Sequence, residues 1–267
     1  MKPSEILRDL KKFPSKILGQ NFLVDDSAIE AMLEAAQLSM EDTVVEIGPG
    51  LGALTFPLLT RVNRVIAIEQ DRELANYLYL KKVKKLTVVT GDALKVDWTV
   101  AIPGVYKIVA NIPYSITFPL LRKIFSLDRP PTLVALLIQK EAADRLIAPP
   151  GSSERGLPTV RTEANARAKV VKRVPSGSFY PRPTVDASII VFELMPSRDA
   201  EVFWPAVEAG FRHKRQTLAN GLNKDLKIPK SMLAEFIATI GQKEKCRAQE
   251  LTFEDWVALS KLLTSVE

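Results

Sequence analysis

The sequence predicts an α/β fold with a largely parallel sheet, followed by a small all-helical domain. Through the first two-thirds of the 267 residues, short β-branched runs alternate with helical stretches, and a glycine-rich turn follows the first run. Near 195–197 the spacing of apolar residues changes and is helical from there on. We therefore expect a sheet domain at 1–196 and a helical domain at 197–267.

Each expected element of the sheet domain rests on local composition. The expected strands are short runs rich in β-branched residues, at 43–47, 64–68, 86–90, 106–110 and 132–138. The expected helices have apolar residues at helical spacing, at 53–59, 73–80, 118–125 and 140–147. Two more strands, 169–174 and 187–194, are close enough to pair as an antiparallel edge. Strands joined by helices favour a Rossmann-like sheet.

In the expected helical domain, apolar residues recur every three or four positions. They are Val202, Phe203, Val207, Phe211, Leu218 and Leu222, followed by the segments 232–240 and 256–263. This spacing predicts helices that pack around a core of their own.

Composition excludes several classes of protein. Hydrophobic residues are 46% and charged residues 25%, an ordinary balance for a globular chain. One cysteine and one histidine exclude an internal disulfide and a Cys/His metal site, so we expect no metal. The longest apolar run, 133–138, is far below the roughly 20 residues of a membrane span. We expect a cytoplasmic protein, and the net charge of +6 favours a polyanionic partner.

A glycine-rich turn follows the first expected strand. The turn reads Glu46-Ile47-Gly48-Pro49-Gly50-Leu51-Gly52, and Ala53 completes a G-x-G-x-x-A register that begins at Gly48. Glycine lets a backbone turn sharply and approach a ligand closely, so the pattern predicts a nucleotide-like cofactor at Gly48 and Gly50. A tight strand-to-helix connection without a ligand would explain the same glycines, but the position after the first strand favours the cofactor.

Two carboxylates follow the next two expected strands. Glu69, just after 64–68, can accept hydrogen bonds from both ribose hydroxyls of an adenosine group. Asp92, followed by Ala93, comes after 86–90 and can accept from an adenine amine. Either carboxylate alone could be a solvated residue or a helix cap. Their positions after successive strands predict that they share one crevice with the glycine turn.

Asn111-Ile112-Pro113-Tyr114, at the end of the fourth expected strand, suits methyl transfer to an exocyclic adenine amine. The lone pair of that nitrogen is delocalised into the ring, and two acceptors on its hydrogens would draw it toward tetrahedral geometry. We expect the Asn111 side-chain oxygen and the Ile112 carbonyl to be these acceptors, and to stabilise the developing ammonium. Pro113 restricts Ile112 to an extended conformation, and Tyr114 can stack on the base. A simple turn explains Asn111 and Pro113 but not Tyr114.

Together these motifs resemble the ribosomal RNA adenine dimethyltransferase family, from about residue 13 to the end. The stretches LGQNFLVD (18–25), QKEAADRL (139–146), SFYPRPTVD (178–186) and FRHKRQTL (211–218) also resemble that family. The resemblance implies a class I S-adenosylmethionine-dependent methyltransferase. It implies that the cofactor contacts Asn21, Leu23, Gly48, Glu69, Asp92 and Asn111.

The same stretches resemble the housekeeping branch of the family, although Ala187 stands where the family usually has Ser. That branch dimethylates two adjacent adenosines in the 3′-terminal hairpin loop of 16S RNA in the small ribosomal subunit. The resemblance thus implies 16S rRNA as the partner, and we expect a monomer. Phe179 is a candidate second aromatic that clamps a flipped base opposite Tyr114, and core packing is the alternative for it.

Three other functions remain open from the sequence. They are a resistance-type methyltransferase acting on 23S rRNA, a nicotinamide-dependent dehydrogenase and a non-catalytic RNA-binding assembly factor. The dehydrogenase leaves residues 111–114 without a role.

Basic residues are concentrated at 154–182, which has seven of them against two acidic residues. They are Arg155, Arg161, Arg167, Lys169, Lys172, Arg173 and Arg182. This excess predicts a footprint for the RNA backbone.

Overall fold

A computed structural model describes residues 2–264, which form two compact units. The sheet unit contains the chain up to 143 and Ala168–Leu194, and the helical unit contains Asp144–Arg167 and the residues from 195 onward. The predicted boundary at 196/197 placed 144–167 in the sheet domain. Backbone hydrogen bonds explain the difference, because Gly151 N–H donates to the Gln249 carbonyl and Met195 N–H to the Asn165 carbonyl.

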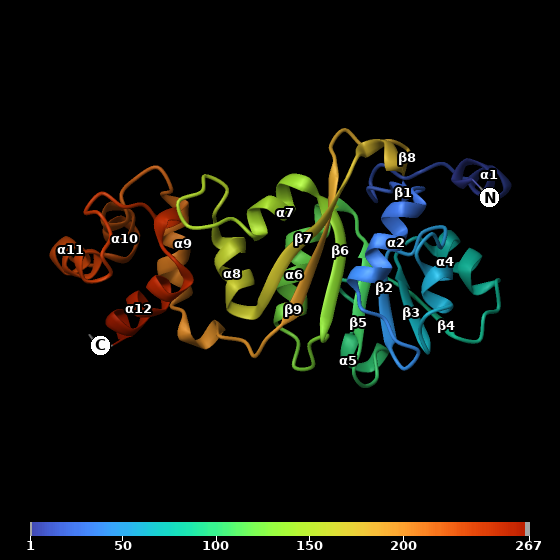
Figure 1. Cartoon of the computed structure of the whole chain (residues 1–267), viewed down its shortest axis with the longest axis horizontal. Helices are drawn as coiled ribbons and strands as arrows, with labels where there is room; N and C mark the ends of the chain where they lie inside the picture. Colours follow the sequence, from blue (N-terminus) through green and yellow to red (C-terminus); the bar gives the residue numbers. More distant parts are fainter. Residues whose placement is uncertain (1, 265–267) are drawn as a thin grey trace. The chain divides into compact units, whose positions relative to one another are not determined.

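A seven-stranded sheet forms the centre of the sheet unit, in the order β4-β3-β2-β5-β6-β9-β7 (Figure 1). The strands are β2 (Thr43–Ile47), β3 (Arg64–Glu69), β4 (Leu86–Thr90), β5 (Lys107–Asn111), β6 (Leu133–Gln139), β7 (Ala166–Val174) and β9 (Ala187–Leu194). The neighbours from β4 to β6 are parallel, and β9 is antiparallel to β6. The predicted α/β class is confirmed, with β9 and β7 at one edge.

Helices connect the parallel strands, as their alternation in the sequence predicts. They are α3 (Thr55–Leu59), α4 (Arg72–Tyr79), α5 (Trp98–Ala101) and α6 (Thr117–Phe125), and α7 (Lys140–Leu146) follows the last of these strands, β6. A helix that the sequence analysis missed, α2 (Asp26–Ala35), contacts β6 and β9. The Asp25 carboxylate caps it by accepting from the backbone of Ser27 and Ala28.

A small two-stranded sheet joins two segments that are far apart in the sequence. β1 (Phe22–Leu23) pairs antiparallel with β8 (Phe179–Tyr180), so that Phe22 lies opposite Tyr180 and Leu23 opposite Phe179. The N-terminal helix α1 (Pro3–Asp9) precedes it. The pairing fastens the 18–25 stretch to the 178–186 stretch.

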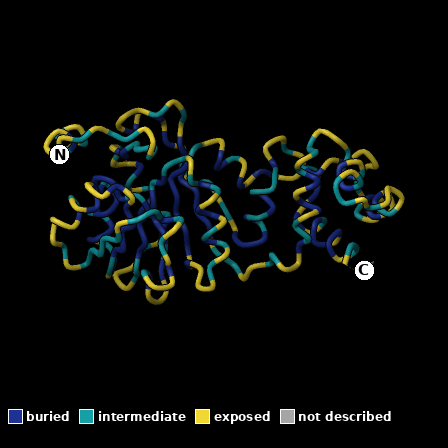
Figure 2. The backbone as a smooth tube through the Cα atoms, turned by 180° about the vertical axis from the view of Figure 1, so that it is seen from behind, coloured by how far each residue is buried: buried dark blue, intermediate teal, exposed yellow. Residues whose placement is uncertain are grey.

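The helical unit has its own hydrophobic core around Trp256, which is fully buried. Figure 2 shows buried stretches of backbone, in dark blue, in both units. Its helices are α8 (Leu157–Asn165), α9 (Trp204–Arg212), α10 (Leu218–Leu226), α11 (Lys230–Thr239) and α12 (Phe253–Thr264). Every helix within residues 2–264 is too short or too polar to span a lipid bilayer.

Candidate active site

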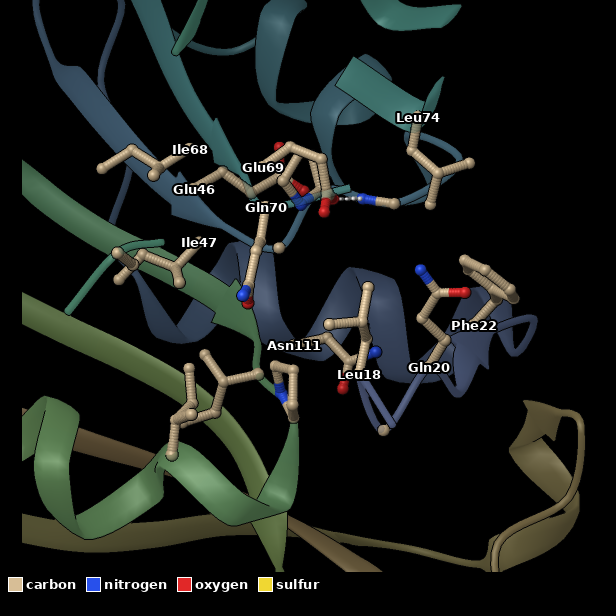
Figure 3. A pocket seen from close by; sticks show the side chains of 18 of the residues that line it. Leu18, Gln20, Phe22, Glu46, Ile47, Ile68, Glu69, Gln70, Leu74 and Asn111 are labelled. Atoms are coloured by element: carbon tan, nitrogen blue, oxygen red, sulfur yellow. Dashed lines mark hydrogen bonds between the residues drawn. The ribbon is translucent and has the colours of Figure 1, made fainter. Parts of the chain in front are cut away.

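A pocket lies where the parallel strands of the sheet unit end. The chain crosses from β2 to β3 and β4 on one side and then returns to β5 on the other side of β2. Ligands of open α/β sheets bind at such a reversal of strand order, outside the carboxyl ends of the strands. The turns after β2, β3, β4 and β5 and residues 18–23 line the pocket (Figure 3).

Eleven of the twelve predicted site residues line this one pocket. They are Asn21, Leu23, Gly48, Gly50, Glu69, Asp92, Ala93, Asn111, Ile112, Pro113 and Tyr114. The twelfth, Phe179, does not line it.

The turn after β2 requires its glycines. Gly48 and Gly50 have φ angles of +68° and +57°, which residues with a side chain rarely adopt. A Cβ atom on Gly50 would lie 3.0 Å from the ring of Phe22. At Gly48 and Gly50, therefore, the backbone of the turn carries no side chain, and a ligand in the pocket can approach it closely.

The Glu69 carboxylate is buried and held by two backbone donors. Oε2 accepts from Gly50 N–H at 3.0 Å, and Oε1 accepts from Asp71 N–H at 2.9 Å. Burial raises the pKa of Glu69 despite these hydrogen bonds. Each oxygen retains one lone pair, so the carboxylate can still accept from two hydroxyl groups.

Glu46 is a second buried carboxyl group in the pocket wall, and the sequence analysis gave it no role of its own. It lies close to Glu69 in Figure 3, and its Oε2 accepts from the Thr55 hydroxyl at 2.6 Å. Burial, reinforced by the charge of Glu69, raises the pKa of Glu46 to about 8. Its position near the end of a strand, at the start of a glycine motif, was the feature of the sequence that could have indicated a role for Glu46.

Asp92 follows β4, and two strands, β3 and β2, lie between β4 and the strand that ends at Asn111. Its Oδ1 accepts from Leu94 N–H at 2.9 Å, which is the turn-forming contact of an aspartate at this position. Its Oδ2 lies 3.8 Å from the exposed Lys95 ammonium. An acceptor oxygen thus remains at the pocket beside Ala93.

The side-chain amide of Asn111 has a defined orientation. Its Nδ2 donates to the backbone carbonyl of Asn21 at 3.0 Å, and both residues line the pocket. A carboxamide carries its donor and its acceptor on different atoms, so this contact leaves Oδ1 as the acceptor. The N-terminal segment therefore sets the direction of the Asn111 amide.

Tyr114 begins a short 3₁₀ turn directly after Pro113. Pro113 has extended backbone angles, and the turn places the Tyr114 ring in the pocket wall. Among residues 2–264, the buried Tyr114 hydroxyl has no hydrogen-bond partner. Burial, and then the charges of Asp186 and Glu141, raise the pKa of Tyr114 to about 12, so the phenol is neutral at physiological pH.

Residues 10–21, here called the N-terminal strap, enter the pocket lining at Leu18, and the sequence did not indicate how the strap is anchored. Lys12 Nζ lies 2.9 Å from the Asp71 carboxylate and 2.6 Å from that of Glu73. Gln20 Nε2 donates to the same Asp71 oxygen at 3.0 Å. Burial raises the pKa of Asp71, but the hydrogen bonds from Lys12 and Gln20 outweigh this and lower it. The strap is therefore joined to the residues that directly follow Glu69.

Phe179 does not have the exposure that a base clamp needs. Its side chain is 4% exposed and belongs to the core of the sheet unit, together with Leu23 and Val174. Side chains alternate along β8, so Tyr180 points outward in its place and is 41% exposed. Phe179 is therefore a core residue, which was the alternative to its role as a base clamp.

The predicted RNA footprint at 154–182 is wrong for Arg155, and two other cations of the segment have partners within the protein. Arg155 is fully buried and makes two hydrogen bonds of 2.7 Å with Glu163. The Arg161 guanidinium stacks 4.2 Å from the Trp204 ring centroid, and Lys172 Nζ donates to the Ser27 carbonyl. Arg155 stabilises the helical unit and cannot contact a phosphate without unfolding.

The fold and the pocket together define the class of protein. The pocket fits a dinucleotide or an adenosyl ligand. It has a glycine turn after β2, the buried Glu69 carboxylate at the end of β3 as an acceptor for ribose hydroxyls, and the Asp92 carboxylate after β4. With Asn111–Tyr114 closing the same pocket, the site is that of a class I S-adenosylmethionine-dependent methyltransferase.

Comparison with known proteins identifies the family within that class. The family model for ribosomal RNA adenine dimethylase matches residues 13–265. The ribosomal RNA small subunit methyltransferase A of Clostridium botulinum is 34% identical, with all of both chains covered. A dimethyladenosine transferase from Plasmodium falciparum has a TM-score of 0.72 at 27% identity, over 91% of this chain and 96% of its own. The 23S rRNA methyltransferase ErmE also has a TM-score of 0.72, at 25% identity, over 91% of this chain and 100% of its own.

The chain belongs to the ribosomal RNA adenine dimethylase family. It is an rRNA adenine dimethyltransferase with S-adenosylmethionine as the methyl donor. The family membership confirms the resemblance seen in the sequence and disfavours the dehydrogenase.

Proposed function

We propose that the protein dimethylates two adjacent adenosines in the 3′-terminal hairpin loop of 16S rRNA during assembly of the small ribosomal subunit. The full-length similarity to a small-subunit methyltransferase supports this choice over 23S rRNA. The fold does not discriminate, because the 23S enzyme ErmE superposes as well as the dimethyladenosine transferase.

The pocket residues fit the donor. S-adenosylmethionine supplies a methyl group on a positively charged sulfur, which is the electrophile of the reaction. The bare turn at Gly48 and Gly50 would hold it by close backbone approach, Glu69 would accept from its ribose hydroxyls, and Asp92 from its adenine amine. Asn21 and Leu23, on the strap and β1, would complete the enclosure.

The orientation of the Asn111 amide is the observation that carries the proposed chemistry. Since Nδ2 is engaged by the Asn21 carbonyl, Oδ1 is available to accept from the amine of the target adenine. The Ile112 carbonyl would accept the second hydrogen, and Tyr114 would stack on the base. Both acceptors fit a nitrogen that is becoming positively charged better than they fit the neutral amine.

A monomeric enzyme is part of this proposal. All eleven pocket residues named above lie within the sheet unit, so the proposed roles are all assigned within one compact unit of the chain. We place it in the cytoplasm with its ribosomal substrate.

Methylation of isolated subunits tests the substrate. Small and large subunits from cells lacking the protein are incubated with it and with labelled S-adenosylmethionine, and the modified adenosines are mapped by mass spectrometry. We expect two dimethylated adenosines near the 3′ end of 16S rRNA. Label confined to 23S rRNA would contradict the proposal.

Asn111→Ala tests the chemistry. Loss of one acceptor that acts mainly in the transition state should lower kcat by about 10²–10³-fold. Asn111→Asp, which keeps an oxygen at the site but cannot donate to the Asn21 carbonyl, should also be impaired. An Asn111→Ala enzyme with the parent kcat would exclude the proposed role.

A further inference from the structure

The N-terminal strap has an inner and an outer face with different chemistry. Lys12 and Gln20 on the inner face are tied to Asp71. On the outer face, Phe13 is 88% exposed and Ile17 is 96% exposed. Exposed apolar side chains of this size are costly in water, and two of them within five residues of chain mark an interaction surface.

Hydrogen bonds within the strap hold Ile17 in the solvent. Gln20 N–H donates to the Ser15 carbonyl at 3.1 Å, and Ser15 N–H donates to the Gln20 side chain at 2.8 Å. Gly19 N–H donates to the Lys16 carbonyl, and its φ of +61° closes the turn. Lys16 and Ile17 are therefore at the tip of a closed turn, and their exposure is built into the backbone.

The turn also fixes where this surface lies. The next residue after Ile17, Leu18, lines the pocket, as do all residues from there to Leu23. Gly19 approaches the Asn111–Tyr114 turn so closely that a Cβ atom would lie 3.4 Å from Pro113. Consecutive Cα atoms are about 3.8 Å apart, so the exposed tip is within a nucleotide's length of the pocket wall.

We propose that the outer face of the strap, formed by Phe13, Lys16 and Ile17, binds the RNA nucleotides that flank the target adenosine. This inference rests on the proposed function. Phe13 offers a ring for stacking on a base, Ile17 covers a base or ribose face, and the Lys16 ammonium lies on the phosphate backbone. Alternating apolar and cationic side chains match single-stranded RNA, which exposes base faces and phosphates together.

Charge on the neighbouring residues supports RNA over a protein helix as the occupant. Lys11 lies two residues before Phe13, and Lys16 precedes Ile17, whereas residues 10–21 contain no acidic residue. The exposed Tyr180, opposite Phe22 in the β1–β8 pair, adds an aromatic side chain to the adjoining strand. Figure 2 shows the N-terminal part of the chain mostly as exposed or half-buried backbone.

The sheet provides matched control residues. Tyr79, Lys84 and Val105 are exposed, like their counterparts Phe13, Lys16 and Ile17. Tyr79 ends α4, and Lys84 and Val105 precede β4 and β5, so all three lie toward the amino ends of the strands, opposite the pocket.

The experiment compares the double variant Phe13→Ala/Ile17→Ser with Tyr79→Ala/Val105→Ser. Loss of one stacked base and its apolar neighbour should raise the Kd for unmethylated small subunits, and the KM for them, about tenfold. The kcat and the affinity for S-adenosylmethionine, measured by calorimetry, should stay at the parent values. The control pair should match the parent in all four quantities.

Salt dependence separates the phosphate contact from stacking. The slope of log K against log salt is negative, and Lys16→Ala should make it less negative by about 0.7–0.9, whereas Lys84→Ala should leave it unchanged. Parent-like RNA binding of Phe13→Ala/Ile17→Ser, or equal loss in the control pair, would overturn the inference. Binding is measured without turnover, so failure of the parent to methylate 16S rRNA would refute the proposed function separately.

Discussion

Glu46 shows how burial alters the chemistry of a single residue. Water does not reach its carboxyl group, and the neighbouring Glu69 adds a second negative charge to the same wall. Two buried carboxylates close together cannot both ionise at low cost, so Glu46, whose pKa is raised to about 8, holds the proton. The Thr55 hydroxyl donates to one Glu46 oxygen, and that contact persists when the carboxyl is neutral.

Glu46 should therefore make the stability of the ligand-free protein depend on pH. The pKa of Glu46 rises from an ordinary 4.5 to about 8 in the folded chain. A raised acid pKa stabilises the fold fully below the unfolded pKa, and this contribution is lost as the pH rises to the folded value. We expect the free energy of unfolding of the parent to fall, relative to Glu46→Gln, on the order of a few kcal/mol between about pH 5 and about pH 8. Denaturant titrations across this range measure it.

Glu41→Gln is the matched control, since Glu41 is exposed in the loop before β2. Its pH profile should follow that of the parent. A Glu46→Gln profile parallel to that of the parent would show that Glu46 is ionised throughout.

At the scale of one element, the turn after β2 depends on glycine for two separate reasons. The positive φ of Gly50 disfavours any side chain, and the Phe22 ring occupies the space that a Cβ atom would need. Phe22 belongs to β1, so the turn and the small sheet are fitted to each other.

Gly50→Ala should cost more than the backbone strain of a positive φ. Alanine at a positive φ destabilises by about 1 kcal/mol, and a contact of 3.0 Å in addition forces Phe22 to move. We expect at least a tenfold loss of S-adenosylmethionine affinity by calorimetry. Gly104 also has a positive φ, +74°, but no atom lies within 4 Å of a Cβ built there. Gly104→Ala should therefore lower the stability of the protein and leave its affinity for S-adenosylmethionine unchanged. Equal cofactor affinity in the two variants would contradict the steric account.

At the scale of the whole molecule, the helical unit includes a segment from the middle of the chain. Arg155 connects that segment to the C-terminal part of the chain through a hydrogen bond to the Leu251 carbonyl, just before α12. Within the segment it also donates to the Ala148 carbonyl and to Glu163. A buried guanidinium must be neutralised, so loss of Glu163 leaves an uncompensated charge.

Glu163→Gln should selectively destabilise the helical unit, by about 3 kcal/mol. Hydrogen exchange read by mass spectrometry should show faster exchange across 144–167 and 195–264, and little change in β2–β6. Glu193→Gln is the control, because Glu193 Oε1 lies 3.9 Å from the Lys169 ammonium and both side chains are exposed. This change should alter the free energy of unfolding by less than about 1 kcal/mol. Uniform acceleration in both units would indicate that they unfold together.

Much of the site was predictable from the sequence because the strand ends fix it. In a parallel sheet, residues that follow successive strands meet at one edge, so Gly48, Glu69, Asp92 and Asn111 could be placed together from spacing alone. The anchor of the strap could not be predicted in this way. Lys12, Gln20 and Asp71 meet only through contacts between segments far apart in the chain, and an Asp after a strand gives the same signal as a helix cap.

By itself, the sequence determined the parallel sheet, the candidate site residues at the ends of its strands, and the family. It could do so because hydrophobic periodicity and strand-end motifs are local. The tertiary structure decided which side chains are exposed. Phe179 is in the core while Tyr180 is outside, since pairing with β1 sets the alternation of β8. Arg155 is buried, and the helical unit begins at 144, because hydrogen bonds to distant carbonyls join that segment to the C-terminal part of the chain. Burial of this kind depends on what packs against a residue, and no local pattern contains that information.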